Sequence, residues 1–531
     1  MKKVLALILA TMMVVALVAC GGGAPSTSDP SGSHTVTDVG NINKDQGTTT
    51  PDANATYKKE VTVALWQAID AIDPHLNSGN AAESIYKMIY NQLVNYDWAT
   101  GTITPDLAES WEVENAASYV FHLRKGVKFS NGEELTADDV VYTFAERPAA
   151  VQGTTGSAVW NAIEKVEAID EYTVRIKLTE KDADFMNRIY LAYFAILNRE
   201  ACEADPEKGY TIGTGGWTLN EFKPNDEASF NRCDTAWIWA ENGLNPTEKV
   251  TFRFITEGTT RSIALQNKEI AAAGSISNAD VASLKSAGTN VITYEAETLH
   301  YLFFNMKNGK LAEDVNLRKA IAYALDYQEI VDYATAGLGS RAISMWGKSQ
   351  YGLYEDFEEQ YDIDHAKVKE YLTKAGYPDG FEFELVSREK TIAPLVQAQL
   401  KAVGIIANVT LTDTAGASAI VKSGDFDMMV YSITLQPIGG RFAFIPDINH
   451  STNRAKYDNP DMLAKFTEAK NETDDAKRKE IYKEIQIELH DQIPYLGLYY
   501  PASNVAYCEG VTGILWELDN KPDYSGIRWA E

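Results

Sequence analysis

The sequence lacks the short motifs that carry the commonest hydrolytic chemistries. It contains neither an HExxH zinc-protease motif nor a GxSxG nucleophile turn. Its seven histidines are scattered along the chain rather than gathered into one segment. We therefore expect a protein that is not an enzyme and that uses no cofactor and no metal site.

Cysteine is also rare, with four residues in a chain of 531. Cys202, Cys233 and Cys508 cannot all pair with one another, and none of them shows CxxC or zinc-ligand spacing. We expect buried free thiols at these positions. One Cys202–Cys233 disulfide is the main alternative.

Basic residues are outnumbered, because 48 Lys and Arg stand against 75 Asp and Glu, for a formal charge of −27. Phosphate binding needs a basic surface, so this balance argues against a nucleic-acid partner. It also argues against electrostatic docking on anionic lipid. The charge is typical of a soluble exported protein, and attraction of a cationic ligand is the alternative. The length predicts two or three domains.

One apolar run opens the chain, from Val4 to Ala19, directly after Lys2 and Lys3. This order is typical of a secretory signal peptide, and the run is shorter than the about 20 residues of a membrane-spanning helix. It ends in LVAC at Cys20, which resembles a lipoprotein signal-peptidase box. The resemblance implies a diacylglycerol on Cys20, with cleavage before it. An ordinary signal peptide with an incidental cysteine is the alternative.

Residues 21–56 consist mainly of Gly, Ser, Thr, Asp and Pro, with almost no large apolar side chain. Such a segment cannot bury enough surface to order itself. It is predicted to be a flexible tether that spans roughly 33 Å on average. We therefore assign residues 1–19 to a signal peptide and residues 20–56 to a lipidated tether.

The most informative stretch runs from Pro105 to Phe144. Alternating apolar residues predict a strand around Phe121, and Asn131-Gly132 predicts a tight turn with positive φ. Thr136 stands as the N-cap of a short helix whose first turn is acidic. The stretch therefore predicts a strand, a turn and a capped helix in close succession.

The sequence of this stretch closely resembles the signature of the extracytoplasmic solute-binding proteins, family 5, which serve peptide and nickel ABC importers. The matching pieces are PDLAESW at 105–111, FHLR at 121–124 and TADDV at 136–140. The resemblance implies an α/β fold, the periplasmic-binding-protein-like two-lobed clamp of class II, cluster C. Its mixed sheets carry flanking helices, and its chain crosses twice between the lobes, here near residues 300 and 495.

The resemblance also implies a division of the folded body. Lobe 1 is expected to contain a main domain and an outer subdomain, and lobe 2 to be a single domain. The expected ranges are 57–91, 199–300 and 499–531 for the main domain of lobe 1, 92–198 for its outer subdomain, and 301–498 for lobe 2.

Helix and strand patterns alternate between residues 364 and 431, which predicts βαβ units and a largely parallel sheet. Ligands of such sheets lie beyond the carboxyl ends of the strands. The predicted elements are 364–375, 381–386, 391–403, 405–411, 415–422 and 426–431.

Four further elements are predicted from periodicity: a strand at 61–66, a helix at 80–95, a hairpin around Asp170-Glu171, and one helix over 314–331. Arg318 and Asp326 on the last helix are interpreted as a charge pair that positions a loop. Two amphipathic helices are predicted at 460–470 and 474–490.

Peptide binders of this family hold the ligand's ammonium with an aspartate after the Asp-Met strand. Here the strand stands at 426–429, and alignment places Gln436 where the aspartate is expected. A neutral amide cannot offset a buried ammonium, so the usual anchor is missing or displaced.

Ligand-contact candidates come from the segments that depart from the family pattern and from the aromatic residues. Gly213 to Trp217 is interpreted as a backbone turn lining the cleft rather than a phosphate cradle, and Arg441 as a partner for a ligand carboxylate or as a surface arginine. Each tryptophan has packing in the core as its alternative. The candidates are Trp66, Gln67, Thr214, Gly215, Trp217, Trp346, Tyr431, Gln436 and Arg441.

The resemblance implies a monomeric substrate-binding protein of an ABC importer, lipid-anchored at the extracytoplasmic face of the cell membrane. It would capture an oligopeptide-type solute between its lobes and deliver it to the permease subunits. The alternative within the family is a non-peptide ligand, such as an oligosaccharide, a metal chelate or an opine-like solute. A peptide-sensing receptor, an adhesin or an enzyme is less favoured.

Overall fold

The structure is a computed structural model that describes residues 55–77, 79–97, 100–150, 157–242, 246–347, 350–435, 446–447, 453–517 and 521–531. The predictions for the signal peptide, Cys20, Gln436 and Arg441 lie outside these residues, as does nearly all of the tether. Among the described helices, none is long and apolar enough to cross a membrane.

The first large sheet has seven strands and contains the predicted strand at 61–66, observed as β1 (Glu60–Leu65). Its sequence, EVTVAL, is rich in β-branched residues, and β1 pairs in parallel with β10 and β11. In sheet order the strands are β12 (Asn290–Glu295), β19 (Ala502–Tyr507), β11 (Ala272–Ala273), β1, β10 (Lys249–Phe254), β9 (Glu227–Arg232) and β8 (Trp217–Lys223).

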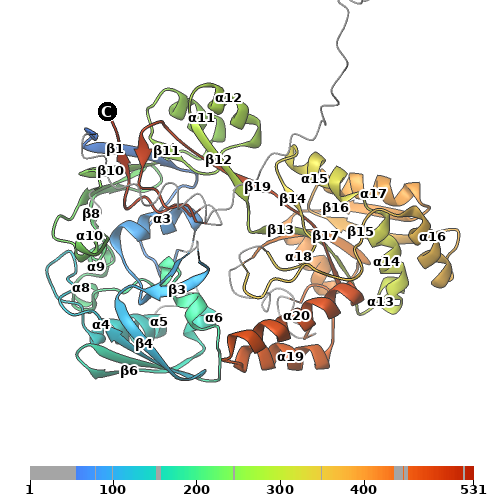
Figure 1. Ribbon diagram of the computed structural model, residues 1–531, viewed down its shortest axis with the longest axis horizontal. Coiled ribbons are helices and arrows are strands. Elements are labelled where there is room, and N and C mark those ends of the chain that lie inside the picture. The colour runs from blue at the N-terminus through green and yellow to red at the C-terminus, as the bar shows by residue number, and fades with distance from the viewer. Residues whose placement is uncertain are drawn as a thin grey trace, which may run out of the picture. The chain divides into compact units, whose positions relative to one another are not determined.

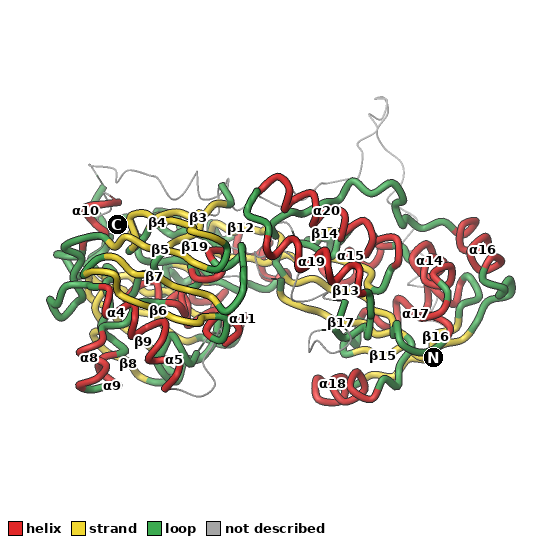
Figure 2. The backbone as a smooth tube through the Cα atoms, turned by 90° about the horizontal axis from the view of Figure 1, so that it is seen from below, coloured by secondary structure: helices red, strands yellow, loops and turns green. Residues whose placement is uncertain are grey.

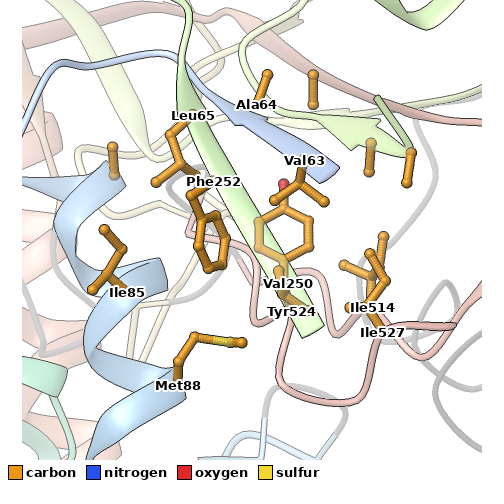
Figure 3. Packing of buried hydrophobic residues seen from close by; sticks show 14 of the residues in the cluster. Val63, Ala64, Leu65, Ile85, Met88, Val250, Phe252, Ile514, Tyr524 and Ile527 are labelled. Atoms are coloured by element: carbon orange, nitrogen blue, oxygen red, sulfur yellow. The ribbon is translucent and has the colours of Figure 1, made fainter. Parts of the chain in front are cut away.

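Helix α3 (Asn80–Ile89) packs on this sheet, and Figure 3 shows Ile85 and Met88 of α3 facing Phe252 and Val250 of β10. The helix is shorter than the predicted 80–95. The backbone becomes extended at Tyr90, because the residues that follow form hydrogen bonds to the signature segment instead of continuing the helix. Asp106 accepts from the Gln92 amide at 3.0 Å, and the carbonyls of Gln92 and Leu93 accept from the next two amides of the signature.

The second sheet has four antiparallel strands, in the order β4 (Ala108–Asn115), β5 (Ser118–Leu123), β7 (Thr173–Leu178) and β6 (Ile163–Asp170). It confirms the strand around Phe121 and the hairpin at Asp170. Gly132 has a φ of +93°, as the predicted turn requires, whereas the positive φ predicted for Asn131 is not observed. Thr136 and Asp139 form a capping box at the start of α4 (Ala137–Val141), which confirms the predicted N-cap.

The third sheet has six strands, and β15 pairs in parallel with both β16 and β17, as the alternating pattern predicts. The two hydrophobic clusters on its faces place α14, α15, α16 and α17 on one side and α18, α19 and α20 on the other (Figures 1 and 2). In sheet order the strands are β14 (Ser340–Arg341), β18 (Tyr495–Tyr500), β13 (Thr298–Phe304), β17 (Met428–Thr434), β15 (Glu382–Ser387) and β16 (Ile406–Leu411).

The helices on this sheet include the two predicted at 460–470 and 474–490, which are observed as α19 and α20. Their bounds are α14 (Val315–Ala324), α15 (Tyr327–Thr335), α16 (His365–Lys374), α17 (Ile392–Ala402), α18 (Thr414–Ser423), α19 (Pro460–Asn471) and α20 (Asp475–Gln492).

The single helix predicted over 314–331 is wrong, because two helices, α14 and α15, replace it. Leu325 and Asp326 are extended, and the Asp326 carboxylate accepts from the Glu329 amide at 2.9 Å as the N-cap of α15. The predicted Arg318–Asp326 pair is also wrong. Arg318 instead donates to backbone carbonyls, including that of Gln492 at 2.9 Å, and so ties α14 to the end of α20.

The remaining elements are short and join the sheets. Two small hairpin-like sheets are formed by β2 (Val94–Asp97) with β3 (Thr102–Pro105) and by β20 (Val511–Thr512) with β21 (Arg528–Trp529). The short helices are η1 (Tyr142–Glu146), α5 (Arg147–Ala150), α6 (Ser157–Trp160), α7 (Met186–Ile189), η2 (Ala192–Phe194), α8 (Arg199–Ala204), α9 (Pro206–Gly209), α10 (Trp237–Asn242), α11 (Gly258–Gln266), η3 (Asn278–Asp280), α12 (Val281–Ser286) and α13 (Lys310–Glu313).

The chain passes twice between the seven-stranded and six-stranded sheets. The first passage lies between Glu295 of β12 and Thr298 of β13, and the second is Pro501, between β18 and β19. The two passages touch, because the Ala296 amide donates to the Pro501 carbonyl at 2.8 Å. The fold is therefore a two-lobed α/β fold with two neighbouring crossings. We call the part with the seven-stranded and four-stranded sheets lobe 1 and the part with the six-stranded sheet lobe 2; the predicted domain boundaries stay a prediction.

Candidate functional site

Charged and aromatic side chains gather where the parallel strands of lobe 2 end. Arg388 and Glu389 follow β15 directly, and Tyr431 and Ser432 lie in the last half of β17. His300 stands opposite Ser432 in the β13–β17 ladder. This is the edge of a parallel sheet at which α/β proteins bind their ligands. We call these residues, together with Arg454, the strand-end cluster.

Two guanidinium groups flank one tyrosine ring in this cluster. The Cζ of Arg388 lies 4.3 Å from the centroid of the Tyr431 ring, and that of Arg454 lies 4.8 Å from it. Arg388 also donates to the hydroxyls of Thr414 and Ser432, both at 3.4 Å. The Nη1 of Arg454 is buried and has no hydrogen-bond partner in the described part of the chain.

The strand-end cluster carries an excess of positive charge. Its one carboxylate, Glu389, accepts from Ser432 at 3.3 Å and lies 3.7 Å from Nδ1 of His300. Burial lowers the pKa of His300, which stacks on Tyr499, so the imidazole is neutral at pH 7. Among the described residues, neither Arg388 nor Arg454 forms an ion pair within 4.0 Å. Two arginines against one carboxylate leave a net charge of +1.

The sequence between β17 and Arg454 contains one acidic residue, Asp447. Arrangements of this kind hold anions, because a guanidinium pairs with a carboxylate through two parallel hydrogen bonds. The cluster can therefore bind a carboxylate or a similar anionic group.

A buried carboxylate lies just beyond the end of this ladder, on the side where β17 ends. Glu297 is 3% exposed and precedes β13, and its carbonyl accepts from the Leu435 amide at 2.6 Å. Its carboxylate packs against Gly347, where an added Cβ would lie 2.6 Å from Oε2. Burial raises the pKa of Tyr96 in lobe 1, and the charge of Glu297 raises it further. Glu297 thus lies close to residues of both lobes.

Three of the predicted contact residues are enclosed within lobe 1. Thr214 is 1% exposed and donates to the Asn91 side chain at 3.1 Å, and the Gly215 amide donates to the Ile89 carbonyl at 2.8 Å. Trp217 is 1% exposed, and its Nε1 donates to the Ser525 carbonyl at 3.0 Å. These contacts fit the alternative in which the residues serve packing. Their role in binding stays a prediction.

The other candidates occupy different surroundings. Trp66 is half-buried beside the lobe 1 core, and Gln67 is exposed and accepts weakly from the Ala81 amide at 3.4 Å. Trp346 is 1% exposed in the core of lobe 2. Of the candidates in the described part of the chain, Tyr431 alone belongs to the strand-end cluster. Sequence reasoning missed Arg388, although its place directly after a predicted parallel strand was a usable signal.

The three cysteines in the described part of the chain are free, so the alternative Cys202–Cys233 disulfide is wrong. Cys202 and Cys508 are buried and Cys233 is half-buried. Burial raises the pKa of Cys202 to about 12, which leaves its thiol protonated at neutral pH. Within the described residues, no group of three or more His, Cys, Asp or Glu could hold a metal ion.

Several known proteins are similar to this chain in sequence or in structure. The chain is 27% identical over 470 residues to the dipeptide-binding protein of Escherichia coli, covering 80% of this chain and 86% of that protein. It is 26% identical over 462 residues to heme-binding protein A of Haemophilus influenzae, covering 79% and 82%. The structure of HbpA2 from Haemophilus parasuis superposes with a TM-score of 0.80 at 22% identity, covering 88% and 99%.

The two-lobed fold and these relatives define the class, that of the solute-binding proteins. A family model described as "Bacterial extracellular solute-binding proteins, family 5 Middle" matches residues 102–456. The chain belongs to this family of extracellular solute-binding proteins. The resemblance inferred from residues 105–144 is therefore confirmed.

Proposed function

We propose that this protein captures a peptide-type solute with a free carboxylate and delivers it to the permease of an ABC importer. In this proposal it is held at the extracytoplasmic face of the membrane by lipid on Cys20. The names of its relatives support a peptide ligand. They include the E. coli dipeptide-binding protein and the oligopeptide-binding protein AppA of Bacillus subtilis, which is 27% identical over 482 residues.

The excess positive charge of the strand-end cluster is the observation that carries this proposal. A buried guanidinium N–H without a partner is costly, because it has lost its water and gained nothing in return. Arg454 presents such a group beside Arg388, on the ring of Tyr431. A ligand carboxylate would satisfy both guanidiniums and bring the charge of the cluster from +1 to zero.

The ammonium end of a peptide needs a carboxylate, and Gln436 cannot supply one. In the proposal Glu297 takes this part, because it adjoins Leu435, the residue before Gln436, and lies near Tyr96 of lobe 1. Thr298 pairs with Thr434 and Tyr301 pairs with Tyr431, so Glu297 lies just beyond one end of the ladder and the arginines lie at its middle. Opposite charges at these two positions favour a zwitterionic solute.

A thermal-shift titration tests the proposal directly. The purified protein is heated with a pool of random tri- to pentapeptides, with the same pool amidated at its C-termini, and with a panel of sugars and metal chelates. Ligand at about 100 times its Kd adds roughly 2.7 kcal/mol to the stability of the folded state. The expected result is a raised Tm with the free-acid pool alone. A shift with sugars or chelates only would overturn the peptide assignment.

An anionic non-peptide ligand is the second candidate. The neutral Gln436 and the cationic strand-end cluster suit an opine-like solute that carries carboxylates but needs no ammonium anchor. The structure of AgaA, solved with agropinic acid, superposes with a TM-score of 0.66 at 25% identity, covering 88% of this chain and 96% of that one. In the same titration, an opine panel that raises Tm more than the peptide pool would favour this candidate.

A further inference from the structure

The segment between β7 and α7 forms an acidic loop in lobe 1. The Asp182 amide donates to the Ala116 carbonyl at 2.7 Å, and the Tyr119 hydroxyl donates to the Asp182 carbonyl at 2.7 Å. The Asp182 carboxylate pairs with Arg188 and accepts from the Asp184 amide at 3.1 Å. The loop is therefore fixed to the four-stranded sheet.

This loop contacts the last two long helices of lobe 2. The Ala183 amide donates to the carbonyl of Lys470 in α19 at 2.8 Å. Arg478 of α20 donates to the Ala183 carbonyl at 3.2 Å and pairs with Asp184 at 3.3 Å, and the Tyr482 hydroxyl donates to Asp184 at 3.2 Å. These partners are nearly 300 positions apart in the chain. Helices α19 and α20 can be followed in red in Figure 1.

The centre of this contact is closed to solvent. Asp184 and Tyr482 are both 0% exposed. The Arg478 side chain is 11% exposed. Arg478 also lies over the ring of Tyr351, with Cζ 4.2 Å from its centroid. A second pair, Lys470 with Glu180, lies at the rim, where the Glu180 side chain is 72% exposed. Buried pairs of this kind depend strongly on both partners.

The chain joins the lobes only at residues 296–297 and 501, and the four-stranded sheet is connected through lobe 1 alone. A rotation of the lobes about these crossings that moves the four-stranded sheet away from α20 separates Asp184 from Arg478. We propose that residues 183, 184, 470, 478 and 482 form a latch whose making and breaking sets the equilibrium between joined and separated lobes before a ligand binds. The latch is a two-state contact that biases this equilibrium.

The hydrogen-exchange rate of one backbone amide reports whether the latch is formed. The Ala183 amide is protected only while it donates to Lys470 across the lobes, so its exchange reports opening of the latch. Hydrogen–deuterium exchange is measured on the ligand-free protein and on Asp184→Asn, which keeps the shape of the side chain and removes its charge. We expect exchange in peptides covering 180–185 to rise about tenfold, because Arg478 then loses its buried counter-charge and keeps only the exposed carboxylate of Asp475, at 3.9 Å.

Two internal controls separate opening from unfolding. Exchange in β5 and β7 should be unchanged in Asp184→Asn, and Glu180→Gln at the rim should behave as wild type. Unchanged exchange at 180–185 would overturn the latch, and so would an equal rise in β5 and β7, which would show that the pair serves folding of lobe 1. If Asp184→Asn does not fold, Tyr482→Phe removes one hydrogen bond to Asp184 and should give a smaller rise confined to 180–185, with the same contradictory outcomes. No ligand is added, so the result is independent of the peptide assignment.

Discussion

At the scale of single residues, the strand-end cluster determines which ligand charges the protein can accept. Arg388 and Arg454 share the Tyr431 ring, and Glu389 balances only one of them. Hydrogen bonds to charged groups are worth about 1.5–3 kcal/mol each. Removal of one guanidinium should therefore lower the ligand affinity measurably, while the protein still folds.

We predict that Arg388→Gln weakens binding of a free-acid peptide by about 10- to 100-fold, since 1.4 kcal/mol corresponds to a factor of ten. Calorimetric titration with a peptide from the thermal-shift pool measures this. The same peptide with an amidated C-terminus should lose a similar factor on the wild-type protein and little more on Arg388→Gln. Arg199→Gln, at a half-buried arginine of lobe 1 paired with Glu146, is the matched control. Additive losses would show that Arg388 does not meet the carboxylate.

A second residue-scale prediction concerns pH. Burial raises the pKa of Asp106 to about 7, although the Gln92 amide, Arg124 and Asn91 act against this. An unfolded aspartate titrates near 3.9, so between these values the folded state binds the extra proton. The contribution of Asp106 to stability is therefore full below about pH 4 and is lost as pH rises through about 7. Asp106→Asn should remove this fall, which is up to about 1.4 kcal/mol per pH unit.

Denaturant unfolding at several pH values between 4.5 and 8 tests this prediction. Glu109→Gln replaces an exposed carboxylate on the neighbouring strand and should keep the wild-type profile. A profile for Asp106→Asn that parallels wild type would contradict the assigned cause.

The sequence identified the scaffold residues more completely than the binding residues. Thr136 and Gly132 were predicted correctly because caps and tight turns depend on local chemistry. Tyr431 was a predicted contact and does belong to the cluster. Arg454 and Glu297 were missed because their placement depends on how distant strands meet. No local pattern encodes that.

At the scale of elements, periodicity predicted the alternating helices and strands of lobe 2 within a few residues. It failed where tertiary contacts end a helix whose apolar pattern continues. Helix α3 ends at Ile89 because the backbone groups that follow it form hydrogen bonds to the signature segment. The predicted helix over 314–331 is interrupted at Leu325. Asp326 was interpreted as a charge partner, although aspartate is also a strong N-cap.

The element-scale prediction is that Asp326→Ala lowers the free energy of unfolding by about 1 kcal/mol, through loss of the α15 N-cap. Urea denaturation followed by circular dichroism measures the change. Asp332→Ala on the same helix removes only a contact with the Gln328 side chain and should cost less than about 0.5 kcal/mol. Equal losses in the two variants would contradict the capping role.

At the scale of the whole molecule, the proposed lipid on Cys20 would keep the binding protein near its permease. Two acyl chains give stable anchoring, whereas one alone is marginal. We predict that Cys20→Ala moves the protein from the membrane fraction to the soluble fraction of its host. Cell fractionation with detection of the protein shows the outcome. Retention of Cys20→Ala in membranes would contradict the lipoprotein assignment.

The central claim is that the two lobes of this extracellular solute-binding protein hold a peptide. Native mass spectrometry of the purified protein, with release and fragmentation of whatever has co-purified, tests it most directly. The predicted result is a set of added masses that fragment as peptides with free C-termini, and that decline in Arg388→Gln. An added mass that fragments as a hexose series or as a metal complex would contradict it.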